Sequence, residues 1–197
     1  MKKRIIIIIV AIIIIAGVLG AFYYSIHSNN ANVENSTEVT ELEDLLTEDL
    51  EDNYPASPRA VVNEYSRYLV ALYNEDYTDD QFNTLTEKMR ILLDDDLLEE
   101  NPIEYFRSNL KSEADSYKSD EWQVTDFVIP SSDEVTYDTV KGNDCALVTV
   151  SYYIKQKTTY SKTVQDYVFR QDNEGRWKIL GYSLHSGSED DDSEDAE

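Results

Sequence analysis

The chain has 197 residues, and its 40 acidic against 17 basic side chains give a formal net charge of −23 at pH 7. This acidity argues against a nucleic-acid-binding protein, which needs basic side chains to neutralise phosphates. One cysteine forms neither an internal disulfide nor a thiolate-rich zinc site, and two histidines leave few places for imidazole chemistry. The length allows one ordinary domain with flanking segments, or at most two small ones.

The charge is distributed unevenly along the chain. Residues 1–4 carry three positive charges, residues 34–52 hold nine acids and no base, and the tail after Gly187 holds seven acids and no base. Residues 54–187 carry a net charge of −10. Sixteen negative charges therefore lie in two flanks, outside the expected domain.

The N-terminus is expected to cross a membrane. Residues 5–24 read IIIIIVAIIIIAGVLGAFYY, without a single charge, and a helix of this length spans about 30 Å, the hydrocarbon thickness of a bilayer. The aromatic end of the run and the basic residues 2–4 fit an interfacial belt and the positive-inside rule. We expect residues 1–26 to form a cytoplasmic stub and transmembrane anchor in the cell membrane, contacting the lipid bilayer through residues 5–24. The N-terminus would be cytoplasmic and the domain extracellular.

A cleaved signal peptide is the alternative interpretation of this segment. Its apolar core should be shorter, roughly 7–15 residues, and should end in small residues at a cleavage site. The best candidate here, Leu19-Gly20-Ala21, has a leucine where a small residue is required. No cysteine follows the run directly, which excludes lipoprotein processing. We favour the uncleaved anchor.

The two acidic flanks, residues 27–54 and 186–197, are expected to be a disordered linker and a disordered tail, because like charges repel and few apolar groups are present. Four leucines of the linker recur at helical spacing: Leu42, Leu45, Leu46 and Leu50. They predict either an acidic docking helix for a partner or a transient helix in a solvated spacer. We favour the spacer. The adjacent acids of the tail lack the ligand alternation and turn glycine of an EF-hand loop.

Residues 55–185 are expected to fold as one α+β domain that starts with three helices. Ser57-Pro58 is a typical helix start, Thr78 with Gln81 forms a capping-box pattern, and Asn101-Pro102 begins the third helix. Apolar residues at three- and four-residue spacing follow each start, as in Val61, Tyr65, Tyr68 and Leu72 of the first helix. Each helix is thus expected to bury one face.

After Asp120 the apolar period changes from about 3.6 to 2, which predicts strands. The expected strands are Trp122–Ile129, Glu134–Val140, Cys145–Gln156, Lys162–Arg170 and Arg176–Leu184. Three helices followed by four or five antiparallel strands predict an α+β fold with the helices packed on one face of a curved antiparallel sheet.

The tyrosine-rich first helix, the strand CALVTVSYYIK and above all the ending NEGRWKILGYSL resemble the nuclear transport factor two-like superfamily. The resemblance covers about Pro55–Leu184 and implies a cone formed by a curved sheet around a long helix. Related domains often dimerise through the open sheet face, so a homodimer is possible. The order of anchor, acidic spacer and domain also resembles uncharacterised single-pass surface proteins of Gram-positive bacteria. The resemblance implies a fold and a location, without a mechanism.

Enzymes of that superfamily, such as ketosteroid isomerases and polyketide cyclases, use an Asp or a His–Asp pair inside the cone. The strand acids here are Asp126, Asp138 and Asp166. Asp126 is in alternation with Trp122, Val124 and Val128, and Asp166 is in alternation with Val164 and Val168. A carboxylate on such an apolar face would have a raised pKa and could act as a general base. The alternate face of each strand is the more apolar one, so we expect Asp126 and Asp166 to face solvent rather than a pocket. No catalytic residue is assigned.

The remaining reactive residue types are expected to be passive. His27 and His185 are expected to be solvated residues outside the domain core, and Cys145 a buried, inert thiol. The acids at residues 94–96, with Glu99 and Glu100, are expected to form a solvated loop between helices. No phosphate loop, nucleophile elbow or metal-helix motif occurs in the sequence, so neither a cofactor nor a metal is expected.

These observations favour a membrane-anchored extracytoplasmic module that binds or scaffolds an envelope protein and is not an enzyme. The alternatives are a small-ligand receptor that uses the cone pocket and a pocket enzyme with an Asp general base. Tyrosine lines pockets well because it is large and carries a polar tip. The tyrosines expected nearest such a pocket are Tyr152, Tyr153, Tyr167 and Tyr182.

Overall fold

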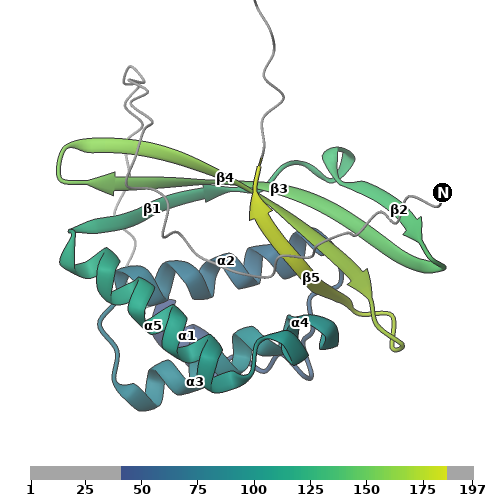
Figure 1. Ribbon diagram of the computed structural model, residues 1–197, viewed down its shortest axis with the longest axis horizontal. Coiled ribbons are helices and arrows are strands. Elements are labelled where there is room, and N and C mark those ends of the chain that lie inside the picture. The colour runs from purple at the N-terminus through teal and green to yellow at the C-terminus, as the bar shows by residue number, and fades with distance from the viewer. Residues whose placement is uncertain (1–40, 186–197) are drawn as a thin grey trace, which may run out of the picture.

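The computed structural model describes residues 41–185, a layer of helices against one antiparallel sheet (Figure 1). The expected anchor, the first part of the acidic linker, His27 and the tail all lie outside the described residues. Within residues 41–185, no helix is both long enough and apolar enough to cross a bilayer.

Within residues 41–185, five helices precede the sheet: one in the expected linker and four in the expected domain, where three were predicted. They are α1 (Glu41–Thr47), α2 (Pro58–Asn74), α3 (Asp79–Ile91), α4 (Asp95–Glu100) and α5 (Ile103–Ser119). The Ser57 hydroxyl accepts the amide of Ala60 at the start of α2, and Thr78 and Gln81 form the expected capping box of α3. At the third start the cap differs from expectation, because Pro102 occupies the N-cap of α5 and Asn101 ends α4 instead.

The sheet has five antiparallel strands: β1 (Trp122–Val128), β2 (Thr136–Val140), β3 (Asn143–Gln156), β4 (Thr159–Gln171) and β5 (Trp177–Leu184). The short 3₁₀ turn Ser132–Glu134 separates β1 from β2. The order is β1-β3-β4-β5, and β2 pairs with the other end of the same edge of β3. This confirms the α+β class and the antiparallel sheet.

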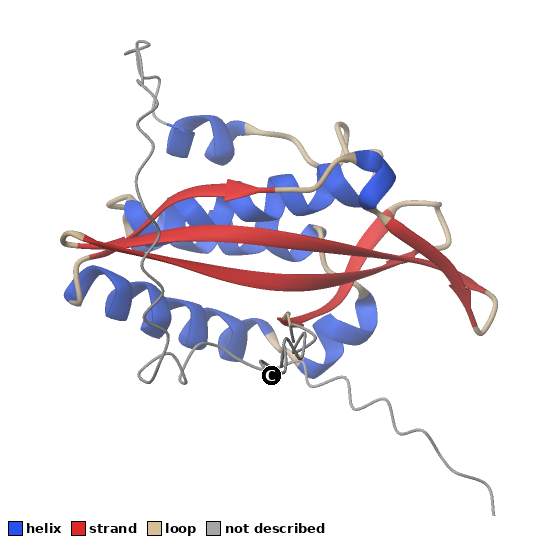
Figure 2. Ribbon diagram, turned by 90° about the horizontal axis from the view of Figure 1, so that it is seen from above, coloured by secondary structure: helices blue, strands red, loops and turns tan. Residues whose placement is uncertain are grey.

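All five helices lie on one side of the sheet, as Figures 1 and 2 show together. The long helix α2 packs against β1, β3 and β5, and α5 packs against α2 and β1. Alternate residues of the two longest strands are buried on the helix side: Ala146, Val148, Val150, Tyr152 and Ile154 on β3, and Tyr167 and Phe169 on β4. The other side of the sheet carries no helix among the described residues, and we call it the open face.

Helix α1 lies inside the segment expected to be a solvated spacer, so the expectation fails for residues 41–54. Leu45 is completely buried, Leu50 is 2 % exposed and Leu42 is 7 % exposed, all within the main core. The Tyr54 hydroxyl also donates to the carbonyl of Trp177 at 2.7 Å. A helix this short is marginal alone, and its burial against α2 and α3 supplies the stability that its sequence lacks.

The acidic segment at residues 94–96 is also more structured than expected. It contains the start of α4, with the Asp94 side chain accepting the amide of Asp96 at 3.0 Å. Asp94 is only 3 % exposed and accepts two hydrogen bonds from the Arg170 guanidinium of β4. Asp94 is therefore a buried structural ion-pair partner rather than a solvated loop residue, whereas Glu99 and Glu100 are exposed.

Candidate functional site

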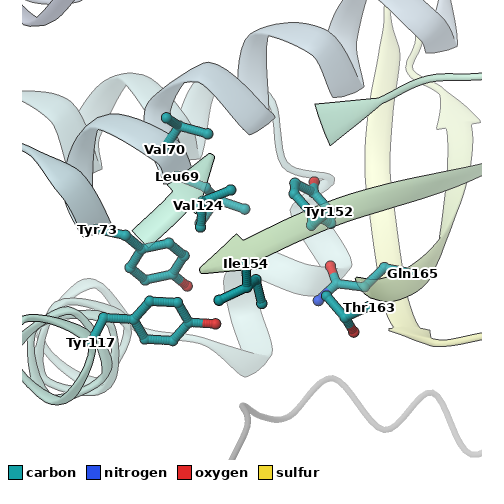
Figure 3. A pocket seen from close by; sticks show the side chains of 9 residues that line it. All are labelled: Leu69, Val70, Tyr73, Tyr117, Val124, Tyr152, Ile154, Thr163 and Gln165. Atoms are coloured by element: carbon teal, nitrogen blue, oxygen red, sulfur yellow. The ribbon is translucent and has the colours of Figure 1, made fainter. Parts of the chain in front are cut away.

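A pocket lies between the helix layer and the sheet, where α2 and α5 face β1, β3 and β4 (Figure 3). The space free of atoms in and before it is about 340 Å³, open solvent included, and about 30 Å³ of it can take the centre of a water-sized group. Nine side chains line it: Leu69, Val70, Tyr73, Tyr117, Val124, Tyr152, Ile154, Thr163 and Gln165. We call this site the tyrosine pocket.

Two stacked tyrosines form one wall of the pocket. The rings of Tyr73 on α2 and Tyr117 on α5 are 4.4 Å apart and 15° from parallel. Figure 3 shows both hydroxyls pointing toward the space beside Ile154. Trp122 packs edge-on against Tyr117 at 5.4 Å, which holds this wall from behind. The stack thus presents two hydroxyl groups at an otherwise apolar surface.

A chain of hydrogen bonds ends at the opposite wall. The Ser66 and Tyr152 hydroxyls are 2.7 Å apart, the Tyr152 and Tyr167 hydroxyls are 2.7 Å apart, and Tyr167 donates to the Gln165 side-chain oxygen at 2.8 Å. Burial raises the pKa of Tyr152 to about 12, so this hydroxyl stays protonated at neutral pH. Because Tyr167 occupies its oxygen, the Gln165 amide is held in a fixed orientation at the pocket.

Glu113 on α5 lies beside this tyrosine cluster, and sequence reasoning missed it. Burial raises the pKa of its carboxyl to about 7, and the Tyr73 hydroxyl opposes that rise in part. Its Oε1 atom is buried without a hydrogen-bond partner among the described residues. The available signal was its position three residues after Leu110 and four before Tyr117, on the buried stripe of α5. Because Ser112 and Asp115 nearby are also polar, the sequence did not distinguish Glu113 from the exposed face of the helix.

Asp126 does not enter the pocket, because a β-bulge between Val124 and Asp126 reverses the alternation on β1. Val124 is 4 % exposed on the helix side, and Phe127 packs on Tyr152 on that same side at 6.2 Å. Asp126 is exposed on the open face, where its carboxylate accepts the amide of Phe127 at 2.8 Å. The expectation of a solvent-facing carboxylate holds, although the expected register with Val124 does not.

Asp166 also lies on the open face, where it meets His185. Thr149 donates to its Oδ1 at 2.6 Å, and His185 Nδ1 is 2.8 Å from its Oδ2. The backbone amide of His185 donates to the carbonyl of Val164 at 2.9 Å, which extends the pairing beyond β5. His185 was expected to be a solvated residue outside the domain core, and it is exposed, but it also forms a His–Asp pair that the sequence did not predict. This pair is on the side of the sheet opposite the tyrosine pocket.

The other candidates divide between the two faces. Tyr167 and Tyr182 pack on each other at 5.6 Å, and both contact Tyr65 behind the pocket. Tyr153, also expected near the pocket, is on the open face instead, because its neighbour Tyr152 takes the buried side.

Cys145 is half-buried with a free thiol, not fully buried, and Asp138 is exposed on β2. Residues 41–185 contain no cluster of three or more His, Cys, Asp or Glu side chains arranged to hold a metal ion.

The geometry therefore offers an apolar pocket with several uncharged hydrogen-bonding groups and one neighbouring carboxyl of raised pKa. Comparison with known proteins gives no match among curated proteins. One protein-family model matches residues 1–182, a range that includes both the apolar N-terminal run and nearly all of the described fold. The chain belongs to the family described as Domain of unknown function (DUF6715).

Proposed function

We propose that this protein is a membrane-anchored, extracytoplasmic, non-catalytic binding module whose ligand site is the tyrosine pocket. The observation that carries the proposal is the lining of the pocket. Apolar side chains of Leu69, Val124 and Ile154 face the hydroxyls and the amide of Tyr73, Tyr117, Thr163 and Gln165. Small-molecule sites combine such walls with a few polar groups that orient the ligand. The lining suits a small, uncharged ligand with an apolar part and one or two hydrogen-bonding groups.

The location part of the proposal rests on the N-terminal sequence. Residues 5–24 are long enough to span a bilayer, and the three basic residues before them favour a cytoplasmic N-terminus. The folded domain would then stand outside the cell, at the end of a short tether. A scaffold that binds an envelope protein through its surface remains the alternative within this class.

A relationship to the nuclear transport factor two-like superfamily fits the same proposal. The long helix α2 lies under the sheet, the tyrosine pocket lies between them, and the last strand, β5, belongs to the segment NEGRWKILGYSL. In a cone of this kind the pocket lies between the sheet and its helices, which is where the tyrosine pocket lies.

Glu113 favours a second candidate function, a proton-transfer enzyme. A carboxyl whose pKa is about 7 is suited to exchange protons near neutral pH. Asp126 and Asp166 do not meet the geometric condition for the Asp-based enzyme, because both lie across the sheet from the pocket. A reaction of the bound ligand that Glu113→Gln slows, while binding persists, would move the assignment to this class.

The test is to recover the ligand with the protein. The full chain is purified from native membranes and analysed by mass spectrometry for small molecules released on denaturation. Thr163→Phe fills the pocket from β4, whereas Val164→Phe adds the same bulk to the open face one residue later. Tryptophan fluorescence checks that both variants fold.

A molecule that accompanies the wild type and Val164→Phe, but not Thr163→Phe, is the expected result. Equal recovery from all three proteins, or recovery of none, would contradict the pocket as the ligand site. Specific capture of an envelope protein by all three proteins would then support the scaffold alternative.

A further inference from the structure

The hairpin that joins β3 and β4 differs in charge from the rest of the domain. Residues 151–165 contain three lysines and no acid, whereas residues 41–185 as a whole contain 31 acidic and 14 basic side chains. The hairpin lies at one end of the molecule, and the β4–β5 turn lies at the other (Figures 1 and 2). The fold thus has one cationic tip on an otherwise strongly anionic body.

Aromatic side chains accompany the lysines at this tip. Tyr160 is 62 % exposed, the most exposed of the large apolar side chains within residues 41–185. The Lys155 ammonium is 5.8 Å from the Tyr160 ring, and the Lys162 ammonium is 5.9 Å from the Tyr153 ring. In each pair the lysine and the tyrosine are directly opposite each other in the β3–β4 register. All four side chains therefore lie on the open face. We call Tyr153, Lys155, Lys157, Tyr160 and Lys162 the hairpin patch.

The acidic groups nearest the patch neutralise little of its charge. Glu121 is 4.0 Å from Lys157, and both side chains are about 70 % exposed, so this ion pair is weak. Asp126, which is paired in register with Tyr153, and Asp166, which is paired with His185, lie on the same face as the patch. Lys155 and Lys162 have no ion-pair partner among the described residues.

We propose that the hairpin patch contacts the anionic lipid headgroups of the bilayer that holds the protein's own anchor. Lysine attracts anionic headgroups, and tyrosine favours the interface because its ring is apolar and its hydroxyl is wet. The remainder of the domain is repelled by the same surface, which orients the molecule with this tip toward the bilayer. This inference rests on the membrane anchor of the proposed function.

The length of the tether makes a weak contact effective. Only the 16 residues 25–40 separate the apolar run from α1, and they reach at most about 55 Å when fully extended. A domain held so close meets the surface at an effective concentration in the millimolar range. Each lysine near an anionic surface raises the equilibrium constant for contact about five-fold, so the three together raise it roughly a hundredfold.

The experiment places a donor fluorophore at either end of the full chain. Cysteine is introduced by Thr158→Cys at the hairpin tip or by Asn173→Cys in the β4–β5 turn, each with Cys145→Ser. The protein is reconstituted in phosphatidylcholine vesicles with or without phosphatidylglycerol, and energy transfer to a headgroup acceptor is measured. The test variant is Lys155, Lys157 and Lys162 replaced together by Gln, with tryptophan fluorescence as the check of folding.

We expect transfer from position 158 to exceed transfer from position 173 only in vesicles that contain phosphatidylglycerol. High salt and the triple Gln variant should each reduce it to the level in phosphatidylcholine. Equal transfer from both positions, or transfer unchanged by the triple variant, would overturn the lipid contact while the anchor stands. Protein that fails to float with either kind of vesicle would refute the anchor itself.

Discussion

The burial of α1 leads to a quantitative prediction about a segment that reads as a linker. Leu45 is completely buried among residues of α2 and α3, so Leu45→Ala removes its methyl groups from the core and leaves a cavity. Substitutions of this kind cost about 2–5 kcal/mol. Alanine is the better helix former, so a loss would not come from weakening α1 itself.

Urea unfolding of the full chain in detergent measures this loss. Both tryptophans of the protein, Trp122 and Trp177, lie in the described domain, so their fluorescence reports its unfolding and not that of the N-terminal run. Leu46→Ala, at a half-buried position of the same helix, is the matched control and should cost less than about 1 kcal/mol.

A change of less than about 0.5 kcal/mol for Leu45→Ala is what a solvated spacer would give, and it would refute the docked helix. Equal losses for Leu45→Ala and Leu46→Ala would show that the effect does not come from burial of one face.

Three further predictions concern the buried polar groups. Tyr152→Phe leaves Ser66 and Tyr167 without their shared hydroxyl and should lower the free energy of unfolding by about 1–2 kcal/mol, whereas Tyr153→Phe on the open face should have no measurable effect. Asp94→Asn should cost about 1–3 kcal/mol in the same urea assay, because it weakens the buried pair with Arg170, and an unchanged midpoint would show the pair to be dispensable. The Glu113 carboxyl has its pKa raised by burial from 4.5 to about 7, so its neutral form favours folding; this stabilisation is complete below about pH 4.5 and is lost as the pH rises through 7. Glu113→Gln should therefore flatten the decline in unfolding free energy between those pH values, and a decline as steep as in the wild type would contradict the buried carboxyl.

The features that follow from local sequence were predictable. The caps at Ser57 and Thr78 need only nearby residues, and alternation along residues 145–156 reports one buried face directly. These signals predicted the starts of α2 and α3, the strand positions and the α+β class. They also placed Tyr152 on the buried face of its strand.

The features that depend on distant contacts were not predictable. The spacing of the linker leucines allowed a helix, but only α2 and α3 decide that it docks. The bulge before Asp126 is a matter of pairing between β1 and β3, and alternation alone does not reveal it. The burial of Glu113 depends on how α5 packs against the tyrosines. The Asp166–His185 pair depends on how the chain after β5 pairs with β4. The sequence therefore predicted only part of the candidate site.

The proposed location places the domain outside the cell on an intact anchor, and the hairpin proposal rests on that anchor. The most direct test is to label Thr158→Cys, in the Cys145→Ser background, with a membrane-impermeant maleimide on intact cells. We predict labelling as complete as after lysis, on full-length protein that stays with the membrane after carbonate extraction. Labelling that requires lysis, or a labelled protein released from the membrane, would contradict the account.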